Sequence, residues 1–181
     1  MASSKIANFA KTMFHKYPLT TNSFVYGVLY VGAEFSQQTL TRKFLPEKPI
    51  NYDTATIGRY AVMGTTMYAP ILYYWYRWLD KKYVGKSAKI IVKKLLLDQF
   101  LLTPPLLVIF FVGMSVMERK TNYMEECKNK ILPTFQTSCL FWLPAQAFNF
   151  MLIPPAFRVI YVGSCAFVWV NILCWIKRQT Y

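Results

Sequence analysis

Long runs without a charged residue alternate with clusters of lysine and arginine along this chain. Five such runs extend over residues 17–33, 60–76, 99–117, 131–157 and 159–176, and they are 17 to 27 residues long. A helix needs about 20 mostly apolar residues to cross about 30 Å of hydrocarbon. Because a soluble core rarely repeats runs of this length five times, the pattern predicts an all-α integral membrane protein with a single membrane domain.

Polar residues between the runs set the expected helix boundaries. We expect four transmembrane helices, at 21–40, 54–79, 95–117 and 159–176, and Asp53 or Thr54 as the N-cap of the second. Residues 1–16 place apolar side chains at helical spacing among three lysines and no acid. This predicts an amphipathic helix at the membrane surface, with an organelle-targeting signal as the alternative.

Prolines interrupt the longest run. Residues 131–157 hold Pro144, Pro154 and Pro155, which disfavour continuous helix, and with 159–176 they exceed the length of one span. The sequence therefore predicts a proline-broken segment over 131–157 that is re-entrant or interfacial.

Basic residues predict the orientation. With four crossings, the N-terminus, residues 77–98 and the C-terminus share one side and hold 12 Lys and Arg, against 8 on the other side besides Arg158. The excess favours the first side as the cytoplasm-like or matrix-like one.

Composition narrows the class further. Hydrophobic residues make up 55% and charged residues 16% of the chain, whereas soluble domains carry about a quarter charged residues. The net charge of +13 comes from lysines and arginines that flank the apolar runs, where juxtamembrane anchors lie, so we expect no direct binding of nucleic acid.

The residue inventory offers little catalytic chemistry. The four cysteines form no CxxC pair and the chain has one histidine, so we expect no metal site and no cofactor. A Ser/His/Asp set and a Gly-rich phosphate loop are missing from the sequence, which argues against an enzyme. Cys127 lies in a predicted polar loop and is a candidate redox thiol.

Several segments resemble one known family in order and spacing. They are HKYPLTTN, AEFSQQ, GRYAVMG, APILYYWYRWLD, LLLDQFLLTPP and WLPAQAFNFMLIPPAFRVIY. This pattern resembles the Mpv-seventeen family, also named for the twenty-two-kilodalton peroxisomal membrane protein, and is most similar to its Mpv-seventeen-like branch. The most specific positions are Trp142, Pro144, Gln146, Asn149, Phe150, Pro154 and Arg158.

The resemblance implies a multi-pass protein of the mitochondrial inner membrane, with the peroxisomal membrane as the alternative. It also implies a link to small-solute pores and to the control of reactive oxygen species. One departure concerns the first span, where the family's usual Gly-Asp is Ala33-Glu34.

Polar residues at bilayer depth are the candidate site. A charged side chain costs about 2.5 to 3.5 kcal/mol at the bilayer centre on insertion scales, so such residues usually face a bundle interior or a watery cavity. The candidates for a pore or polar cluster are Glu34, Gln38, Arg59, Asp98, Gln99, Gln146, Asn149 and Arg158. We expect Arg158 to pair with Asp98 or Glu34, while the structural alternative is that these groups only clamp helices together.

Two functions follow from this reading. The first is a weakly selective pore for small solutes or ions, and the second is a non-conducting scaffold that docks another organelle-membrane complex. The expected partners are membrane lipids, and other membrane proteins or a second copy of the chain are further candidates.

Overall fold

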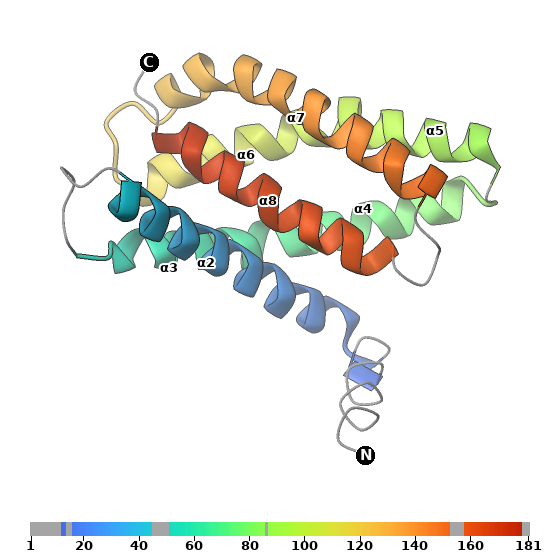
Figure 1. Ribbon diagram of the computed structural model, residues 1–181, viewed down its shortest axis with the longest axis horizontal. Coiled ribbons are helices and arrows are strands. Elements are labelled where there is room, and N and C mark those ends of the chain that lie inside the picture. The colour runs from blue at the N-terminus through green and yellow to red at the C-terminus, as the bar shows by residue number, and fades with distance from the viewer. Residues whose placement is uncertain (1–11, 14–15, 45–50, 86, 153–157, 179–181) are drawn as a thin grey trace.

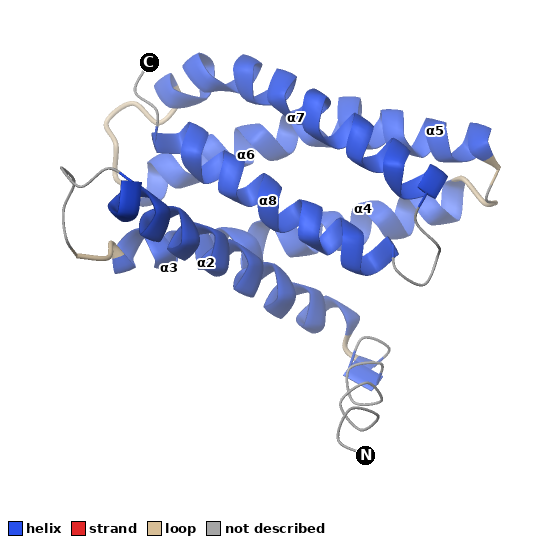
Figure 2. Ribbon diagram, viewed as in Figure 1, coloured by secondary structure: helices blue, strands red, loops and turns tan. Residues whose placement is uncertain are grey.

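The computed structural model describes residues 12–13, 16–44, 51–85, 87–152 and 158–178 of the chain. Within those ranges every regular element is a helix, as Figure 2 shows, and the predicted all-α class is confirmed. The amphipathic helix expected at 1–16 lies almost entirely outside the described residues.

The helices form five rods that run back and forth between the two ends of a bundle (Figure 1). Two of the rods contain a π-helical segment, labelled η. In chain order the rods are α2 (Pro18–Phe44); α3 (Thr54–Val62), η1 (Met63–Tyr68) and α4 (Ala69–Lys82); α5 (Ala88–Leu97), η2 (Asp98–Leu102) and α6 (Thr103–Met117); α7 (Glu125–Leu152); and α8 (Arg158–Arg178).

The two ends of the bundle are built from different parts of the chain. At the left of Figure 1, α2, α6 and α8 finish and α3 and α7 begin, and we call this the network end. At the right, α4 finishes and α5 begins, and we call this the hairpin end. Lys177 and Arg178 therefore lie at the opposite end from the Arg77–Lys94 segment. The four-crossing prediction was based on an excess of Lys and Arg on the side that held both segments. With Lys177 and Arg178 at the other end, that excess is lost.

The expected spans fall on four of the rods, and each rod is longer than its expected span. The side chain of Asp53 accepts a hydrogen bond from the backbone N–H of Thr56 at 2.9 Å, so the predicted N-cap is confirmed. By length and hydropathy alone, one helix in the described ranges, Ala88–Met117, is apolar enough to cross a membrane, with a mean hydropathy of 2.2 in its most apolar window. The number of crossings stays a prediction.

The expectation of a broken segment is wrong for residues 131–152, because α7 is continuous through Pro133 and Pro144. A single proline removes one backbone hydrogen bond, and nearby hydroxyl groups can bond to carbonyls of the disturbed turn. Thr134 donates to the carbonyl of Lys130 at 2.6 Å, and Thr137 donates to that of Pro133 at 2.8 Å. Pro154 and Pro155 lie outside the described residues.

Prolines also follow both π-helical segments. Pro70 comes two residues after η1, and Pro104 comes two residues after η2. A proline cannot donate to the carbonyl four residues before it, and a wider turn relieves the clash of its ring with that carbonyl. In the π-helical turn before Pro104, the Thr103 hydroxyl donates to the carbonyl of Asp98 at 3.1 Å.

The core where α2 meets the second and third rods is aromatic. The Tyr30 and Tyr68 ring centroids lie 5.2 Å apart, and those of Tyr60 and Phe110 lie 5.8 Å apart. Gly64 permits this close packing, because a Cβ atom there would lie 2.8 Å from the carbonyl oxygen of Tyr26. Small residues of this kind allow membrane helices to approach closely.

Candidate functional site

A cavity of about 370 Å³ lies among the five rods, and we call it the central cavity. Each rod contributes side chains to its wall, and most of them are aromatic or aliphatic. The polar and aromatic lining residues are Tyr26, Tyr30, Tyr68, Tyr76, Asp98, Thr103, Ser138, Trp142, Gln146 and Trp169. Concave, mostly apolar sites with a few convergent polar groups are typical of small-molecule sites.

Asp98, the first residue of η2, is the charged group of this wall. The indole N–H of Trp75 donates to its Oδ1 at 2.8 Å, and the hydroxyl of Tyr76 donates to its Oδ2 at 2.8 Å. Both donors are neutral, and in the described part of the chain no lysine or arginine forms an ion pair with this carboxylate. Asp98 is therefore the carboxyl group of the cavity wall, and among the described residues no cation pairs with it.

Two of the predicted glutamines belong to the same region. Gln146 lines the cavity directly. Gln99 is buried, and its amide donates to the Ser138 hydroxyl at 3.1 Å and to the Cys139 sulfur at 3.3 Å. Because Ser138 also lines the cavity, the structure brings Asp98, Gln99 and Gln146 together around one space.

Glu34 and Gln38 do not line the cavity, and they tie α2 to other elements at the network end. The fully buried Oε1 of Glu34 accepts hydrogen bonds from the Arg178 guanidinium and from the Gln38 amide, the latter at 2.9 Å. The Gln38 side chain also pairs with the backbone of Asp53, accepting from its N–H at 2.9 Å. The cation that pairs with Glu34 is Arg178, and the expected partners of Arg158 cannot be placed because its side chain lies outside the described residues.

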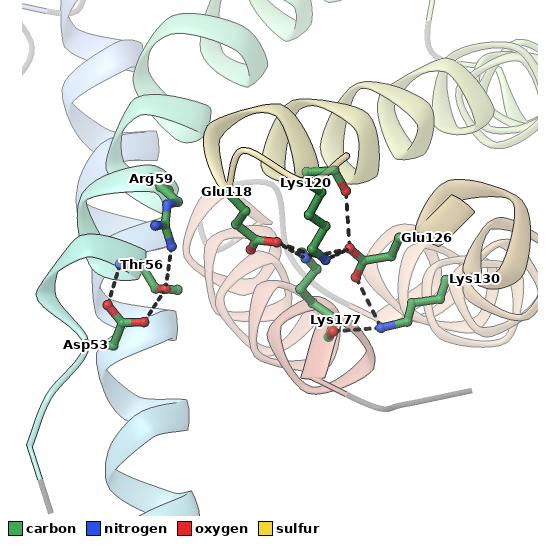
Figure 3. A network of polar contacts seen from close by, with 9 residues as sticks. Asp53, Thr56, Arg59, Glu118, Lys120, Glu126, Lys130 and Lys177 are labelled. Atoms are coloured by element: carbon green, nitrogen blue, oxygen red, sulfur yellow. Dashed lines mark hydrogen bonds and ion pairs between the residues drawn. The ribbon is translucent and has the colours of Figure 1, made fainter. Parts of the chain in front are cut away.

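The remaining predicted residues are placed elsewhere. Arg59 donates to the Thr56 hydroxyl at 3.0 Å within α3, as Figure 3 shows, and it does not line the central cavity. The side chains of Asn149 and Arg158 lie outside the described residues. No group of three His, Cys, Asp or Glu that could hold a metal ion occurs in the described ranges.

Sequence reasoning missed a charged network where α6, α7 and α8 meet, shown in Figure 3. Lys177 binds Glu126 at 2.7 Å and Glu118 at 3.0 Å, and Lys120 and Lys130 bind Glu126 at 2.6 and 3.1 Å. Lys130 also donates to the carbonyl of Lys177 at 2.7 Å. The four-residue spacing of Glu126 and Lys130 was the signal in the sequence for part of it. We call these five residues the charged network.

Burial and the neighbouring lysines shift the pKa of Glu126 in opposite directions. Burial alone would raise the pKa of its carboxyl, but hydrogen bonds from Lys120, Lys177 and Lys130 and the nearby positive charge lower that pKa to about 2. At Lys130 burial prevails and lowers the pKa of the amine. At Lys120 burial is outweighed by hydrogen bonds to Glu126 and Glu118, which raise the pKa. Glu126, at the centre of the network, is therefore ionised at neutral pH.

Cys127 lies in the first turn of α7 and is buried, so the expectation of a thiol exposed in a polar loop is wrong. Burial raises the pKa of this thiol. Reactive cysteines need thiolate character and access to solvent, and neither feature is present here.

A second cavity, of about 430 Å³, lies between α2 and α4 on the hairpin side, and we call it the outer cavity. It shares Tyr26, Leu72 and Tyr76 with the central cavity, so those three side chains form a wall between the two spaces. Arg77 is its charged lining group and donates to the Tyr73 hydroxyl at 3.1 Å.

Comparison with known proteins agrees with the motifs in the sequence. The sequence model of the Mpv17 / PMP22 family matches residues 115–174, which include most of the proline-rich motif. An Mpv17-like protein of Xenopus laevis is 30% identical over 165 residues, covering 91% of this chain and 79% of the relative. Protein sym1 of Aspergillus oryzae is 31% identical over 156 residues, covering 85% of this chain and 87% of the relative. No solved structure matches the chain.

Proposed function

The chain belongs to the Mpv17 / PMP22 family and is a protein of an organelle membrane, and from this premise we propose that it is a weakly selective pore for small solutes or ions. The observation that carries the proposal is the central cavity, because all five rods contribute to its wall and that wall holds Asp98, Ser138 and Gln146. Polar groups that face a shared interior space are what a hydrated path through a bundle requires.

The outer surface of the bundle supports a location in lipid. Large apolar side chains point outward on several rods, and Phe24, Leu132 and Leu140 are 71%, 63% and 78% exposed. Only 39% of the most apolar window of Ala88–Met117 is buried within the protein. The rods hold 21 to 30 residues each, enough to cross about 30 Å of hydrocarbon, so we extend the proposal to five crossings.

The second candidate is a non-conducting scaffold that docks another organelle-membrane complex. The network end favours it, because ion pairs with buried carboxylates join α8 to α7 and to α2 there and none of their residues lines the central cavity. In the pore proposal these contacts are the closed end of the path, and conduction requires that α8 move relative to its neighbours.

Blocking the cavity tests the pore proposal. Ala166 lines the cavity, whereas Val168, two residues along α8, is 48% exposed on the outside. In planar lipid bilayers, purified parent protein and Val168→Phe should conduct, and Ala166→Phe should conduct far less. A parent protein without conductance would support the scaffold, and equal conductance of the two variants would place the path elsewhere.

The compartment is a further part of the proposal. We assign the protein to the mitochondrial inner membrane, with the peroxisomal membrane as the alternative and a role in reactive-oxygen metabolism in either case. The family resemblance of the chain supports this assignment. Subcellular fractionation with protease protection tests it, and recovery of the protein with peroxisomes would overturn the mitochondrial assignment.

A further inference from the structure

We infer that the central cavity is a binding site for a small organic cation of the ammonium class, held by the Asp98 carboxylate and a wall of aromatic rings. The inference rests on the proposed function, since it names the class of solute that the pore would accept. It follows from three features of the cavity, which are its charge, its aromatic wall and its size.

Asp98 is half-buried, and the lack of an ion pair distinguishes it from Glu34 and Glu126, the buried carboxylates of the described chain. Glu34 is paired with Arg178, and Glu126 is paired with three lysines. Among the described residues, Asp98 receives side-chain hydrogen bonds from a tryptophan and a tyrosine, and the lining residues of the cavity include no lysine or arginine. A carboxylate can accept more than two hydrogen bonds, so a ligand N–H or N–CH₃ group can still approach it. The described part of the chain supplies no cation to Asp98, and a ligand can supply one.

Aromatic side chains surround this charge. Tyr26, Tyr30, Tyr68, Tyr76, Trp142 and Trp169 line the cavity. Each ring has a negative face, which attracts a cation within about 6 Å of its centre, and ammonium ligands are commonly bound in such aromatic cages. The Trp142 and Trp169 ring centroids lie 6.4 Å apart, so one ligand can contact both. An anion would be repelled by both the rings and Asp98.

The size of the cavity limits the ligand. Ligand pockets commonly measure about 300 to 1,000 Å³, and the central cavity, at about 370 Å³, is at the small end of that range. Ser138 and Thr103 add hydroxyl groups to the wall, which can bond to a hydroxyl or amine of the ligand. The geometry therefore fits a compact amine or quaternary ammonium compound that also has a short polar group.

Choline and its neutral isostere 3,3-dimethyl-1-butanol are suitable probes, because they have the same shape and differ in charge. Purified protein in nonionic detergent is titrated with each compound, and tryptophan fluorescence reports binding because Trp142 and Trp169 line the cavity. We expect saturable binding of choline and no saturable binding of the isostere at the same concentrations. Equal binding of both compounds, or binding of neither, would overturn the inference. This test needs only the parent protein.

Matched variants locate the site. Asp98→Asn keeps the size of the side chain and should weaken choline binding at least about tenfold, since a close unlike charge is lost. Glu125→Gln removes the same charge from an exposed position at the network end and should bind as the parent does. Trp142→Leu should weaken binding about threefold or more by removing one cation–π contact. Unchanged affinity in Asp98→Asn would overturn the assignment.

The binding assay is independent of conductance, so the two proposals can fail separately. Choline binding that depends on Asp98, in a protein that does not conduct, would leave the cation site in place and remove the pore. Conductance that Ala166→Phe abolishes, in a protein that does not bind choline, would leave the pore and remove the cation site.

Discussion

Glu126 offers the sharpest test of the charged network. Its side chain is only 9% exposed. It forms ion pairs with Lys120 in the loop between α6 and α7, with Lys130 in α7 and with Lys177 in α8. Its pKa falls from 4.5 to about 2, and because one pKa unit corresponds to 1.36 kcal/mol, ionised Glu126 stabilises the fold by about 3 kcal/mol. We therefore expect Glu126→Gln to lower the free energy of unfolding by about this amount at pH 7.

The pH dependence has a defined sign. A carboxyl whose pKa is lowered by folding contributes its full stability above its unfolded pKa and loses it as the pH falls toward the folded pKa. The parent protein should therefore lose this stability between about pH 4.5 and pH 2, whereas Glu126→Gln has no such group to titrate. The stability difference between the two proteins should shrink from about 3 kcal/mol toward zero across that window.

Unfolding by sodium dodecyl sulfate in nonionic micelles, followed by tryptophan fluorescence at a series of pH values, measures this difference. Glu125→Gln is the matched control, because Glu125 is exposed and precedes Glu126 in the same helix turn. It should differ little from the parent at every pH. A Glu126→Gln difference that stays constant with pH, or is absent at pH 7, would refute the reasoning.

Three further predictions follow from the packing. Single cysteines at Val84 and Lys128, exposed at the hairpin and network ends, should react with impermeant reagent from opposite sides of a sealed vesicle, and labelling from one side would contradict five crossings. Gly64→Ala should reduce the yield of folded protein because its Cβ would meet the backbone of α2, whereas Gly58→Ala, with open space around it, should be neutral or add up to about 1 kcal/mol of stability. Glu34→Gln should destabilise the protein in the same unfolding assay, since its arginine partner loses a buried carboxylate; unchanged stability would show that this pair contributes nothing.

Local patterns in the sequence were sufficient for the helical segments. Each of the five charge-free runs falls on one rod, and four of these runs were predicted to be helices. Asp53 was recognisable as an N-cap because its position just before an apolar segment is a local property of the sequence. The prediction of a broken segment over 131–157 was based on Pro144, Pro154 and Pro155. Pro133 and Pro144 are tolerated in a continuous helix, since each removes one hydrogen bond from a ladder of many.

The pairing of side chains could not be predicted in the same way. Glu34 and Arg178 are 144 positions apart, and Lys177 and Glu126 are 51 apart, so the partner depends on the order and direction of the rods. Whether the number of rods is even or odd decides at which end of the bundle α8 finishes. That number depends on whether residues 131–152 form a complete rod, as they do in α7. The grouping of Asp98, Gln99 and Gln146 was more predictable, because polar residues at bilayer depth tend to face a common interior.

The central claim is that Asp98 lines a conducting path, and the reversal potential tests it most directly. In a planar bilayer with a gradient of potassium chloride, the parent protein should show a reversal potential displaced toward that of potassium, because the path passes a carboxylate and no lining cation. Asp98→Asn should move this potential toward zero, while Glu125→Gln should leave it unchanged. An Asp98→Asn protein that conducts with the reversal potential of the parent would contradict the account.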